Sequence, residues 1–349
     1  MLGIPEWLDL GNQIADMIDR FFTWFTNVFG WLFDILRVII ITLLDVVNNL
    51  MTATPWWIWL LVVLIFIGFK YFTKISAKIK WLTMIGVLVV WLVLYNVLVL
   101  NPAVSLDLGN VTTPWWIFIV FLFFATRYLY QGKVMMAVIL SVLLALIGVF
   151  GVWNEMINTV TIVIIAVLIS LLIGIPMGIL MAKSIHAKKI LQPLLDMMQT
   201  IPSFVYLIPA VMLFSIGRVP ATFATIIYAV PPLIRLTYLG IVNVDEEMIE
   251  AGKSFGSTPK QLLFKVQLPQ ALSTIATGIN QTTMMAVSMV VIASMIGAGG
   301  LGSIVLYANQ NIDIGGGFVG GFAIVFLAII LDRLLQGVAD KIESTRGGK

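Results

Sequence analysis

Residues 245–269 read DEEMIEAGKSFGSTPKQLLFKVQLP, a polar and charged stretch in a chain that is otherwise almost continuously apolar. The 349 residues are 60% hydrophobic and only 11% charged, with a mean hydropathy of +1.06. So few charges cannot cover the surface of a soluble domain. The composition therefore predicts a polytopic, all-α membrane protein, and the 245–269 stretch is expected to lie outside the bilayer.

Hydrophobic segments that are long enough to cross a bilayer recur along the chain. A membrane-spanning helix needs about 20 mainly apolar residues. The sequence predicts about nine such spans, at 55–73, 81–100, 114–130, 134–152, 159–182, 193–216, 219–242, 271–297 and 316–338.

The distribution of basic residues predicts how these spans are oriented. If the first span runs inward, all Lys and Arg residues except Arg20, Arg37 and Arg218 fall on the cytoplasmic side. Cationic loops resist translocation, so the 245–269 stretch and the C-terminus are expected in the cytoplasm. The same distribution accounts for the net charge of +3, and no nucleic-acid partner is expected.

Residues 1–53 carry a helical stripe of apolar side chains, from Ile14 to Leu43, opposite a polar face. This pattern predicts an amphipathic helix, broken near Gly30, that lies flat at the outer surface of the membrane. The alternative is a tenth span over Trp31–Val47, which three charged residues within it make costly.

A short motif is repeated, because residues 54–58 and 113–117 both read TPWWI. Each copy opens a hydrophobic segment at its predicted outer end, where tryptophan pairs anchor helices at the membrane interface. The repeat indicates a duplicated helix hairpin, so residues 54–132 are expected to form additional transmembrane hairpins. A tryptophan cage for a ligand is the alternative.

Motifs for catalysis and nucleotide binding are missing or misplaced. The chain has no cysteine and a single histidine, His186, which provides neither a metal site nor a Ser/His/Asp set. The GAGGLG sequence at 297–302 satisfies G-x-G-x-x-G, but it follows a transmembrane segment rather than a strand and is expected to end that helix in a turn. No P-loop sequence occurs, so neither catalysis, nor metal binding, nor a cofactor is expected in this chain.

A few polar residues inside the predicted spans are candidates for a transport pathway. Such groups are expensive in hydrocarbon, so they should face a cavity or a neighbouring helix. Asp196, near the inner end of its span, is instead expected to be solvated or to pair with a basic loop residue, and contact with a substrate is the alternative. The pathway candidates, for which bonding between helices or packing in the core is the alternative, are Gln199, Phe204, Tyr206, Asn280, Gln281, Met284 and Ser288.

Prolines and glycines predict two further features of the spans. Pro202, Pro209, Pro231 and Pro232 are expected to interrupt two adjacent helices beside a cavity. Two G-x-x-x-G patterns indicate close approach of helices, at Gly174/Gly178 and at Gly317/Gly321.

The 245–269 stretch predicts two short helices joined by a turn. Acids from Asp245 to Glu250 suit the first turn of a helix, and Gly256 can end that helix in a left-handed conformation. The second helix is expected to begin near Pro259 and to stop at Pro269.

The residues Glu250-Ala251-Gly252, then Gly256, then Val266-Gln-Leu268-Pro269 resemble the E-A-A-x3-G-x9-I-x-L-P signature of ABC importer permeases. Gly252 replaces the second alanine and Val266 the isoleucine. The stretch from about Leu191 to Arg333 closely resembles the permease of the glycine betaine/proline betaine importers. The 54–132 hairpins depart from that family by adding two helices.

The resemblance implies a type I importer of the bacterial cytoplasmic (inner) membrane, with a permease core over 133–340, a coupling loop at 243–270 and a cytoplasmic tail at 341–349. Two copies of this chain, two ATPase subunits that bind ATP and Mg, and an extracytoplasmic substrate-binding protein are implied. The implied substrates are glycine betaine, proline betaine and related quaternary ammonium osmolytes, held in the binding protein by cation–π attraction. The residues implied to couple to the ATPase are Glu250, Ala251, Gly252, Lys253, Phe255, Gly256, Leu268 and Pro269.

Two other function classes compete with this interpretation. An ion-coupled secondary transporter of small osmolytes would need intramembrane charges or ion ligands, and its uptake would persist without ATP. An assembly or channel protein would use the 245–269 stretch for a different soluble partner, so that Glu250→Lys would leave ATPase association unaffected.

Overall fold

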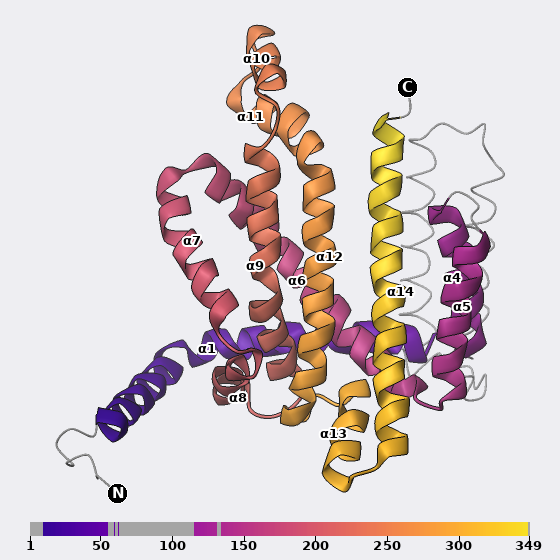
Figure 1. Ribbon diagram of the computed structural model, residues 1–349. Coiled ribbons are helices and arrows are strands. Elements are labelled where there is room, and N and C mark those ends of the chain that lie inside the picture. The colour runs from indigo at the N-terminus through magenta and orange to yellow at the C-terminus, as the bar shows by residue number, and fades with distance from the viewer. Residues whose placement is uncertain (1–9, 55–58, 60–61, 63–114, 131–133, 348–349) are drawn as a thin grey trace, which may run out of the picture.

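The computed structural model describes residues 10–54, 59, 62, 115–130 and 134–347, and every regular element in this part of the chain is a helix (Figure 1). The predicted all-α class is therefore confirmed. In chain order the elements are α1 (Leu10–Thr52), α4 (Trp115–Leu129), α5 (Val134–Val149), α6 (Trp153–Lys183), α7 (Ile185–Thr200), a 3-10 turn (Ser203–Tyr206), α8 (Leu207–Phe214), α9 (Arg218–Val242), α10 (Glu246–Ser254), α11 (Pro259–Leu262), a π-helical turn (Leu263–Gln267), α12 (Leu268–Ala293), a second 3-10 turn (Ser294–Ile296), α13 (Leu301–Asn311) and α14 (Ile314–Gly347).

Four of the described helical runs are long and apolar enough to cross a membrane: Trp153–Lys183, Arg218–Val242, Pro259–Ile296 and Ile314–Lys341. Helices α4 and α5 are also apolar but shorter. The predicted span at 81–100, the span at 55–73 apart from residues 59 and 62, and most of the first TPWWI copy lie outside the described residues. The expected total of nine spans therefore stays a prediction.

The span predicted at 193–216 is not straight. Helix α7 and the segment Ser203–Phe214 meet at an angle of 110°. Pro202 lies at this break, where its missing N–H and its ring prevent α7 from continuing. The other three prolines do not interrupt a helix: Pro209 lies inside α8, and α9 runs through Pro231 and Pro232, both of which are buried against neighbouring helices.

Helix α9 is the centre of the bundle, and glycines bring α6 and α12 close to it (Figure 1). A Cβ atom on Gly174 would lie 2.7 Å from the Leu233 side chain, and one on Gly178 would lie 2.5 Å from Cβ of Thr237. On the other side, a Cβ on Gly278 of α12 would lie 3.1 Å from Cβ of Leu236. Small residues at these positions allow the helix backbones to approach closely.

The second predicted G-x-x-x-G pattern packs differently. A Cβ on Gly317 would make ordinary contact with Ala308 at 3.4 Å, and one on Gly321 would meet nothing within 4 Å. By contrast, the glycines at 297–302 end a helix as expected. Gly297, Gly299 and Gly300 all have positive φ angles, and the backbone N–H of Leu301 donates to Thr159 Oγ1 at 2.8 Å.

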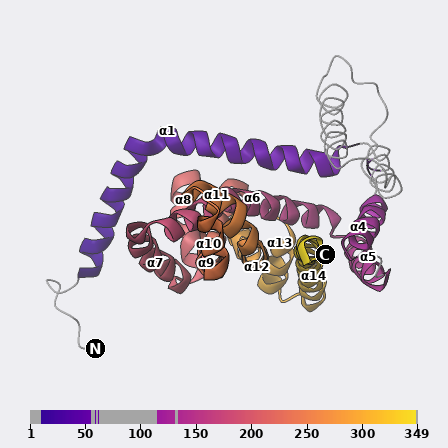
Figure 2. The same cartoon turned by 90° about the horizontal axis from the view of Figure 1, so that it is seen from above.

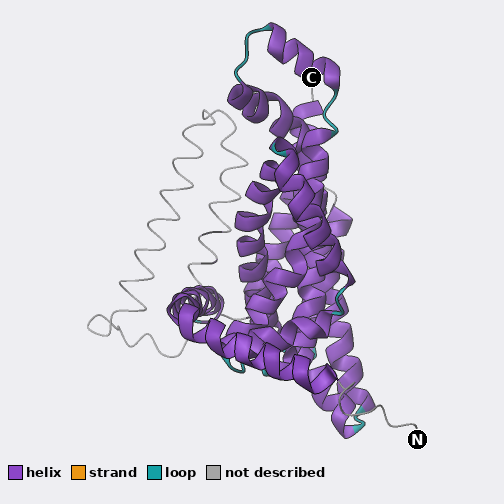
Figure 3. Ribbon diagram, turned by 90° about the vertical axis from the view of Figure 1, so that its left-hand side faces the viewer, coloured by secondary structure: helices purple, strands orange, loops and turns teal. Residues whose placement is uncertain are grey.

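Helix α1 lies across the bundle rather than alongside its long helices (Figures 1 and 3). Its Ile40 and Leu44 side chains are buried in the core, and Phe33 packs edge-on against Phe214 of α8 at 5.8 Å. The helix continues through Gly30, so the break predicted near this residue does not interrupt it. It is instead bent within its length, as Figure 2 shows. Helix α1 is not among the described helices that are long and apolar enough to cross a membrane, and its placement at the outer membrane surface stays a prediction.

The two ends of the bundle carry different elements (Figure 1). The α10–α11 hairpin and the C-terminal end of α14 lie at one end. Helices α1, α8 and α13 lie toward the other end. This arrangement places the polar 245–269 stretch at the tip of the molecule.

The contact between α6 and α9 predicts a stability difference between two glycine variants. Gly178→Ala forces a Cβ against Thr237, so we expect a loss of about 1–3 kcal/mol in unfolding free energy. Gly321→Ala is the matched control, because open space surrounds that position and alanine favours a helix by up to about 1 kcal/mol. Thermal unfolding in detergent measures both, and equal midpoints for the two variants would contradict the packing described here.

Candidate functional site

The first helix of the 245–269 stretch is closed at its start by its own sequence. Asp245 is the N-cap, and its carboxylate accepts a hydrogen bond of 3.0 Å from the backbone N–H of Glu247. Glu246 and Glu247 occupy the first turn and Lys253 the last, where each charge opposes the partial charge of the helix end. Helix α10 is therefore stabilised locally, without a buried side chain of its own.

A glycine reverses the chain after α10. Gly256 has a φ of +76°, a left-handed conformation that side chains disfavour. Its N–H donates to Lys253 O at 2.8 Å, and the N–H of Ser257 donates to Gly252 O at 3.2 Å. Both bonds occupy carbonyls at the end of α10. The predicted role of Gly256 as a helix terminator is confirmed.

The second helix begins with a capping box. Thr258 Oγ1 accepts from the backbone N–H of Gln261 at 3.3 Å, and Gln261 Oε1 accepts from the N–H of Thr258 at 2.9 Å. Pro259 occupies the first turn, as predicted. The two helices then touch at Gly252, where a Cβ would lie 2.7 Å from a terminal methyl of Leu262. The hairpin is thus compact as well as capped at both starts.

The expected stop of this second helix at Pro269 is wrong. The chain is helical without interruption from Pro259 to Ile296. A π-helical turn over Leu263–Gln267, in which the N–H of Leu268 bonds to Leu263 O, shifts the hydrogen-bond register just before the proline. Such a turn accommodates a residue that lacks an N–H and whose ring would clash with the preceding turn. The hairpin is therefore joined directly to a membrane-spanning helix.

The tip of the hairpin exposes apolar side chains. Phe255 is 91% exposed and Phe264 is 64% exposed, and Met248 of α10 is also exposed. The predicted coupling residues Glu250, Ala251, Lys253, Phe255 and Gly256 are all exposed here, while Gly252, Leu268 and Pro269 are half-buried at the base of the hairpin. Phe255 is therefore a candidate contact for another protein.

The candidate pathway residues are separated by the structure. Gln281, Met284 and Ser288 share an exposed face of α12, and Ser288 Oγ donates to Met284 O at 3.0 Å. Asn280 points elsewhere, because its Nδ2 donates to Asp332 Oδ1 on α14 at 2.8 Å. Asn280 therefore lies on the face of α12 that contacts α14, whereas its neighbour Gln281 lies on the exposed face.

The candidates at the bend between α7 and α8 also differ from one another. Gln199 and Phe204 are exposed, whereas Tyr206 is buried and its hydroxyl donates to the Met198 carbonyl. That contact holds the bend together. Asp196 pairs with Arg235, so it has the structural role expected of it, but its partner lies within helix α9 and not in a loop.

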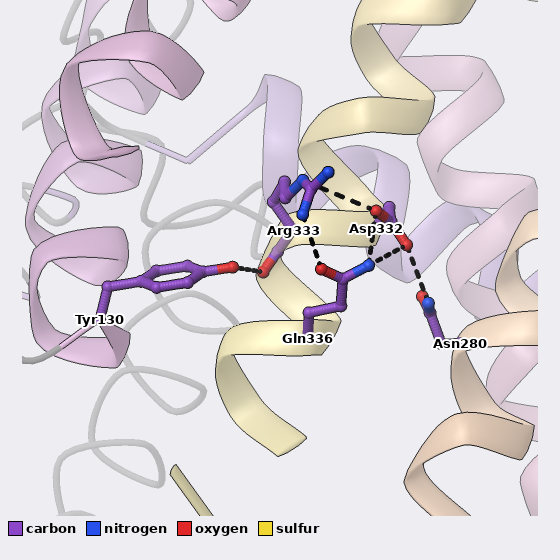
Figure 4. A network of polar contacts seen from close by, with 5 residues as sticks. All are labelled: Tyr130, Asn280, Asp332, Arg333 and Gln336. Carbon is purple, nitrogen blue, oxygen red and sulfur yellow. Dashed lines mark hydrogen bonds and ion pairs between the residues drawn. The ribbon is translucent and has the colours of Figure 1, made fainter. Parts of the chain in front are cut away.

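A polar cluster on α14 was not singled out from the sequence. Asp332, Arg333 and Gln336 bond to one another and to Asn280 (Figure 4). The signal available was an acid inside the apolar segment 316–338.

Comparison with known proteins places this geometry in a family. The model of the family described as "Binding-protein-dependent transport system inner membrane component" matches residues 174–344. The glycine betaine/carnitine transport permease protein of Listeria monocytogenes is 53% identical over 66% of this chain and 83% of its own length. The glycine betaine transport system permease protein of Bacillus subtilis is 38% identical over 95% of this chain and 96% of its own length.

Two further comparisons cover a smaller share of this chain. The glycine betaine/proline betaine transport system permease protein of Escherichia coli is 56% identical over 58% of this chain and 57% of its own length. A solved structure of the MetNI methionine ABC transporter in an inward-facing conformation aligns with 53% of this chain and 91% of its own, at 24% identity and a TM-score of 0.47. From the family model and the two relatives that are covered over most of their length, the chain belongs to the binding-protein-dependent transport system inner membrane components.

Proposed function

We propose that this chain is the transmembrane permease subunit of an ABC importer for glycine betaine and related quaternary ammonium osmolytes. Relatives that it matches along most of their length are named as permeases for glycine betaine or for glycine betaine and carnitine. The observation that carries the proposal is the α10–α11 hairpin, which bears the family's signature residues, exposes Glu250, Ala251 and Gly256 among them, and continues directly into α12. ATP hydrolysis belongs to a separate ATPase subunit.

The hairpin has the physical properties that a lever needs. Its helices are capped by their own side chains, and Gly252 lets them touch, so the tip resists deformation. A push on Phe255 or Glu250 is therefore carried into α12 rather than absorbed by a flexible loop. ATP-driven closure of two docked ATPase subunits would tilt α12 in each of two permease copies and open the pathway to the other side.

The elements at the two ends of the helix bundle support one orientation of the chain in the inner membrane. The hairpin and the C-terminal end of α14 share one end of the bundle (Figure 1), and basic residues are concentrated in the segments predicted on that side. We assign that end to the cytoplasm and the opposite end, with α1, to the extracytoplasmic face. There α1 exposes large apolar side chains such as Phe21, Trp24 and Trp31, which suits a helix that lies in the membrane interface.

We assign the translocation pathway to the exposed face of α12 that carries Gln281, Met284 and Ser288. Polar groups that face hydrocarbon are costly, so this face is expected to meet water or a second copy of the chain. Its mixture of amide, hydroxyl and thioether groups contains no charge that would trap a cation. The tight recognition of the quaternary ammonium group is assigned to the extracytoplasmic binding protein.

Uptake into vesicles tests the proposed function. Vesicles that contain this chain with its ATPase, and the binding protein on the outside, are expected to accumulate labelled glycine betaine only when ATP is present in the lumen. Competition by proline betaine, carnitine, choline and trimethylamine N-oxide ranks the substrates. Uptake that is driven by an ion gradient without ATP would establish a secondary transporter instead.

Removing the exposed aromatic at the hairpin tip is expected to weaken docking of the ATPase. Phe255→Ala should raise the dissociation constant for the ATPase subunit by at least about tenfold, because anchors of this kind dominate protein interfaces. Phe318→Ala, at a phenylalanine that is 64% exposed and lies toward the opposite end of the bundle, is the control and should leave docking unchanged. Quantitative co-purification measures both, and unchanged binding in Phe255→Ala would contradict the docking assignment.

Enlarging a side chain on the proposed pathway is expected to block transport. Met284→Trp should lower uptake by about tenfold while the ATPase remains bound, because the added ring narrows the pathway. Leu172→Trp is the control, since Leu172 is a highly exposed position on α6 and not on the α12 face. Normal uptake by Met284→Trp, measured in the same vesicles, would exclude this face from the pathway.

A further inference from the structure

The polar cluster on α14 contains an acid within a helix that is apolar enough to cross a membrane. Asp332 lies in the Ile314–Lys341 run, and its side chain is only 21% exposed. A carboxylate in such a position is expensive and usually marks a functional contact.

Asp332 joins α14 to α12 (Figure 4). Its Oδ1 accepts from Asn280 Nδ2 at 2.8 Å, and Gln336 Nε2 donates to both carboxylate oxygens at 2.8 Å. Arg333 Nε lies 3.8 Å from Oδ2 and Nη1 of the same guanidinium donates to Gln336 Oε1 at 2.9 Å. Arg333 and Gln336 thus balance and orient the carboxylate from its own helix, and Asn280 supplies the connection to α12.

The next residue joins α14 to α4 on its other side. The Tyr130 hydroxyl donates to the backbone carbonyl of Arg333 at 2.8 Å (Figure 4). A Cβ on Gly337 would lie 2.9 Å from the Tyr130 ring, so the helices are in close contact here. Adjacent positions on α14 therefore hold α12 and the end of α4.

The orientation of the Asn280 amide indicates that its Nδ2–H group, which donates to Asp332, makes the useful contact. Its Oδ1 is buried and has no hydrogen-bond partner among the described residues. If the amide were rotated by half a turn, Oδ1 would face the carboxylate of Asp332. An ionised carboxylate only accepts hydrogen bonds, so the two oxygens could not bond to each other. A leucine of similar size would fill the same space and leave no buried acceptor unpaired. The hydrogen bond from Asn280 to Asp332 is therefore the gain that offsets the cost of the unpaired Asn280 Oδ1.

We propose that Asp332 is a positioning residue of the transport cycle, which locks α12 to α14 through Asn280. Helix α12 continues from the α10–α11 hairpin, and Asn280 lies near the middle of the run from Pro259 to Ile296. A lock at that point makes a push on the hairpin move α12 and α14 as one unit. Without it, α12 tilts alone and ATP is hydrolysed with little transport. The proposal rests on the proposed ABC importer function.

The test measures glycine betaine uptake and ATP hydrolysis in the same vesicles, with the complete complex. Asn280→Leu and Asp332→Leu are expected to keep ATP hydrolysis within about twofold of the unmodified complex and to lower uptake by about tenfold, the factor that a hydrogen bond to a charged group represents. Asp332→Asn retains an acceptor for Asn280 and should keep most of the uptake per ATP. Ser141→Ala, a buried hydroxyl on α5 outside the cluster, is the control and should change neither quantity.

A covalent link distinguishes positioning from general stabilisation. The chain has no cysteine, so a variant with Asn280→Cys and Asp332→Cys carries thiols only at this contact. The native side chains meet end to end, so a short bifunctional thiol reagent suits the gap better than a direct disulfide. The unlinked variant should hydrolyse ATP with low uptake, and linking should restore uptake per ATP. Because the comparison is made within one assembled protein, it holds even if the leucine variants fail to fold.

Several outcomes would overturn the proposal. Normal uptake per ATP in Asn280→Leu would show that the contact is dispensable. A proportional fall of uptake and hydrolysis, with no recovery on linking, would show that the cluster is only structural. Loss of the remaining uptake on linking would show that α12 and α14 must separate. Absence of ATP-dependent uptake by the unmodified complex would instead reject the proposed function.

Discussion

The close approach of α6 and α12 to α9 is the constraint on which the rest of the structure depends. Glycines at 174, 178 and 278 remove the side chains that would otherwise keep these helices apart, and the resulting contacts bury most of α9. In a membrane, where lipid tails are as apolar as leucine, helices associate through such close packing rather than through a hydrophobic driving force. A rigid centre of three helices is what allows the peripheral elements to act on one another.

Several buried hydroxyl groups in this bundle are hydrogen-bonded within their own helix. The hydroxyls of Thr222 and Thr225 on α9 donate to backbone carbonyls four residues earlier in the same helix, and Thr283 on α12 does the same. This arrangement removes the cost of a buried hydroxyl without requiring a partner on another helix. The side chains that reach between helices, such as Asn280 toward Asp332, therefore stand out as contacts with a different role.

In the proposed importer, the hairpin and the polar cluster are two parts of one mechanical connection. The hairpin is rigid because its caps and its glycine turn are satisfied within a few residues, and the π-helical turn lets the chain pass Pro269 into α12. From there, the contact of Asn280 with Asp332 reaches α14, and Tyr130 reaches α4. In the proposed importer, a movement at Phe255 would thus spread through α12 to the periphery of the permease.

The sequence by itself determined the helical class, the polar hairpin with acids at its start, and the turn at Gly256. These features depend mainly on residues within three or four positions of one another, or on composition, so a linear pattern is sufficient. The resemblance to importer permeases, carried by the hairpin and the core, was likewise visible and is confirmed by the comparisons.

Only the tertiary structure decided the 110° bend after α7, the passage of the chain through Pro269, Pro231 and Pro232, and the lack of close packing at Gly321. It also decided which face of α12 meets α14, and so separated Asn280 from Gln281. The physical reason is that each of these outcomes depends on which distant helix occupies the adjacent space. A local sequence pattern records that a proline, glycine or amide is present, but not which neighbour it meets.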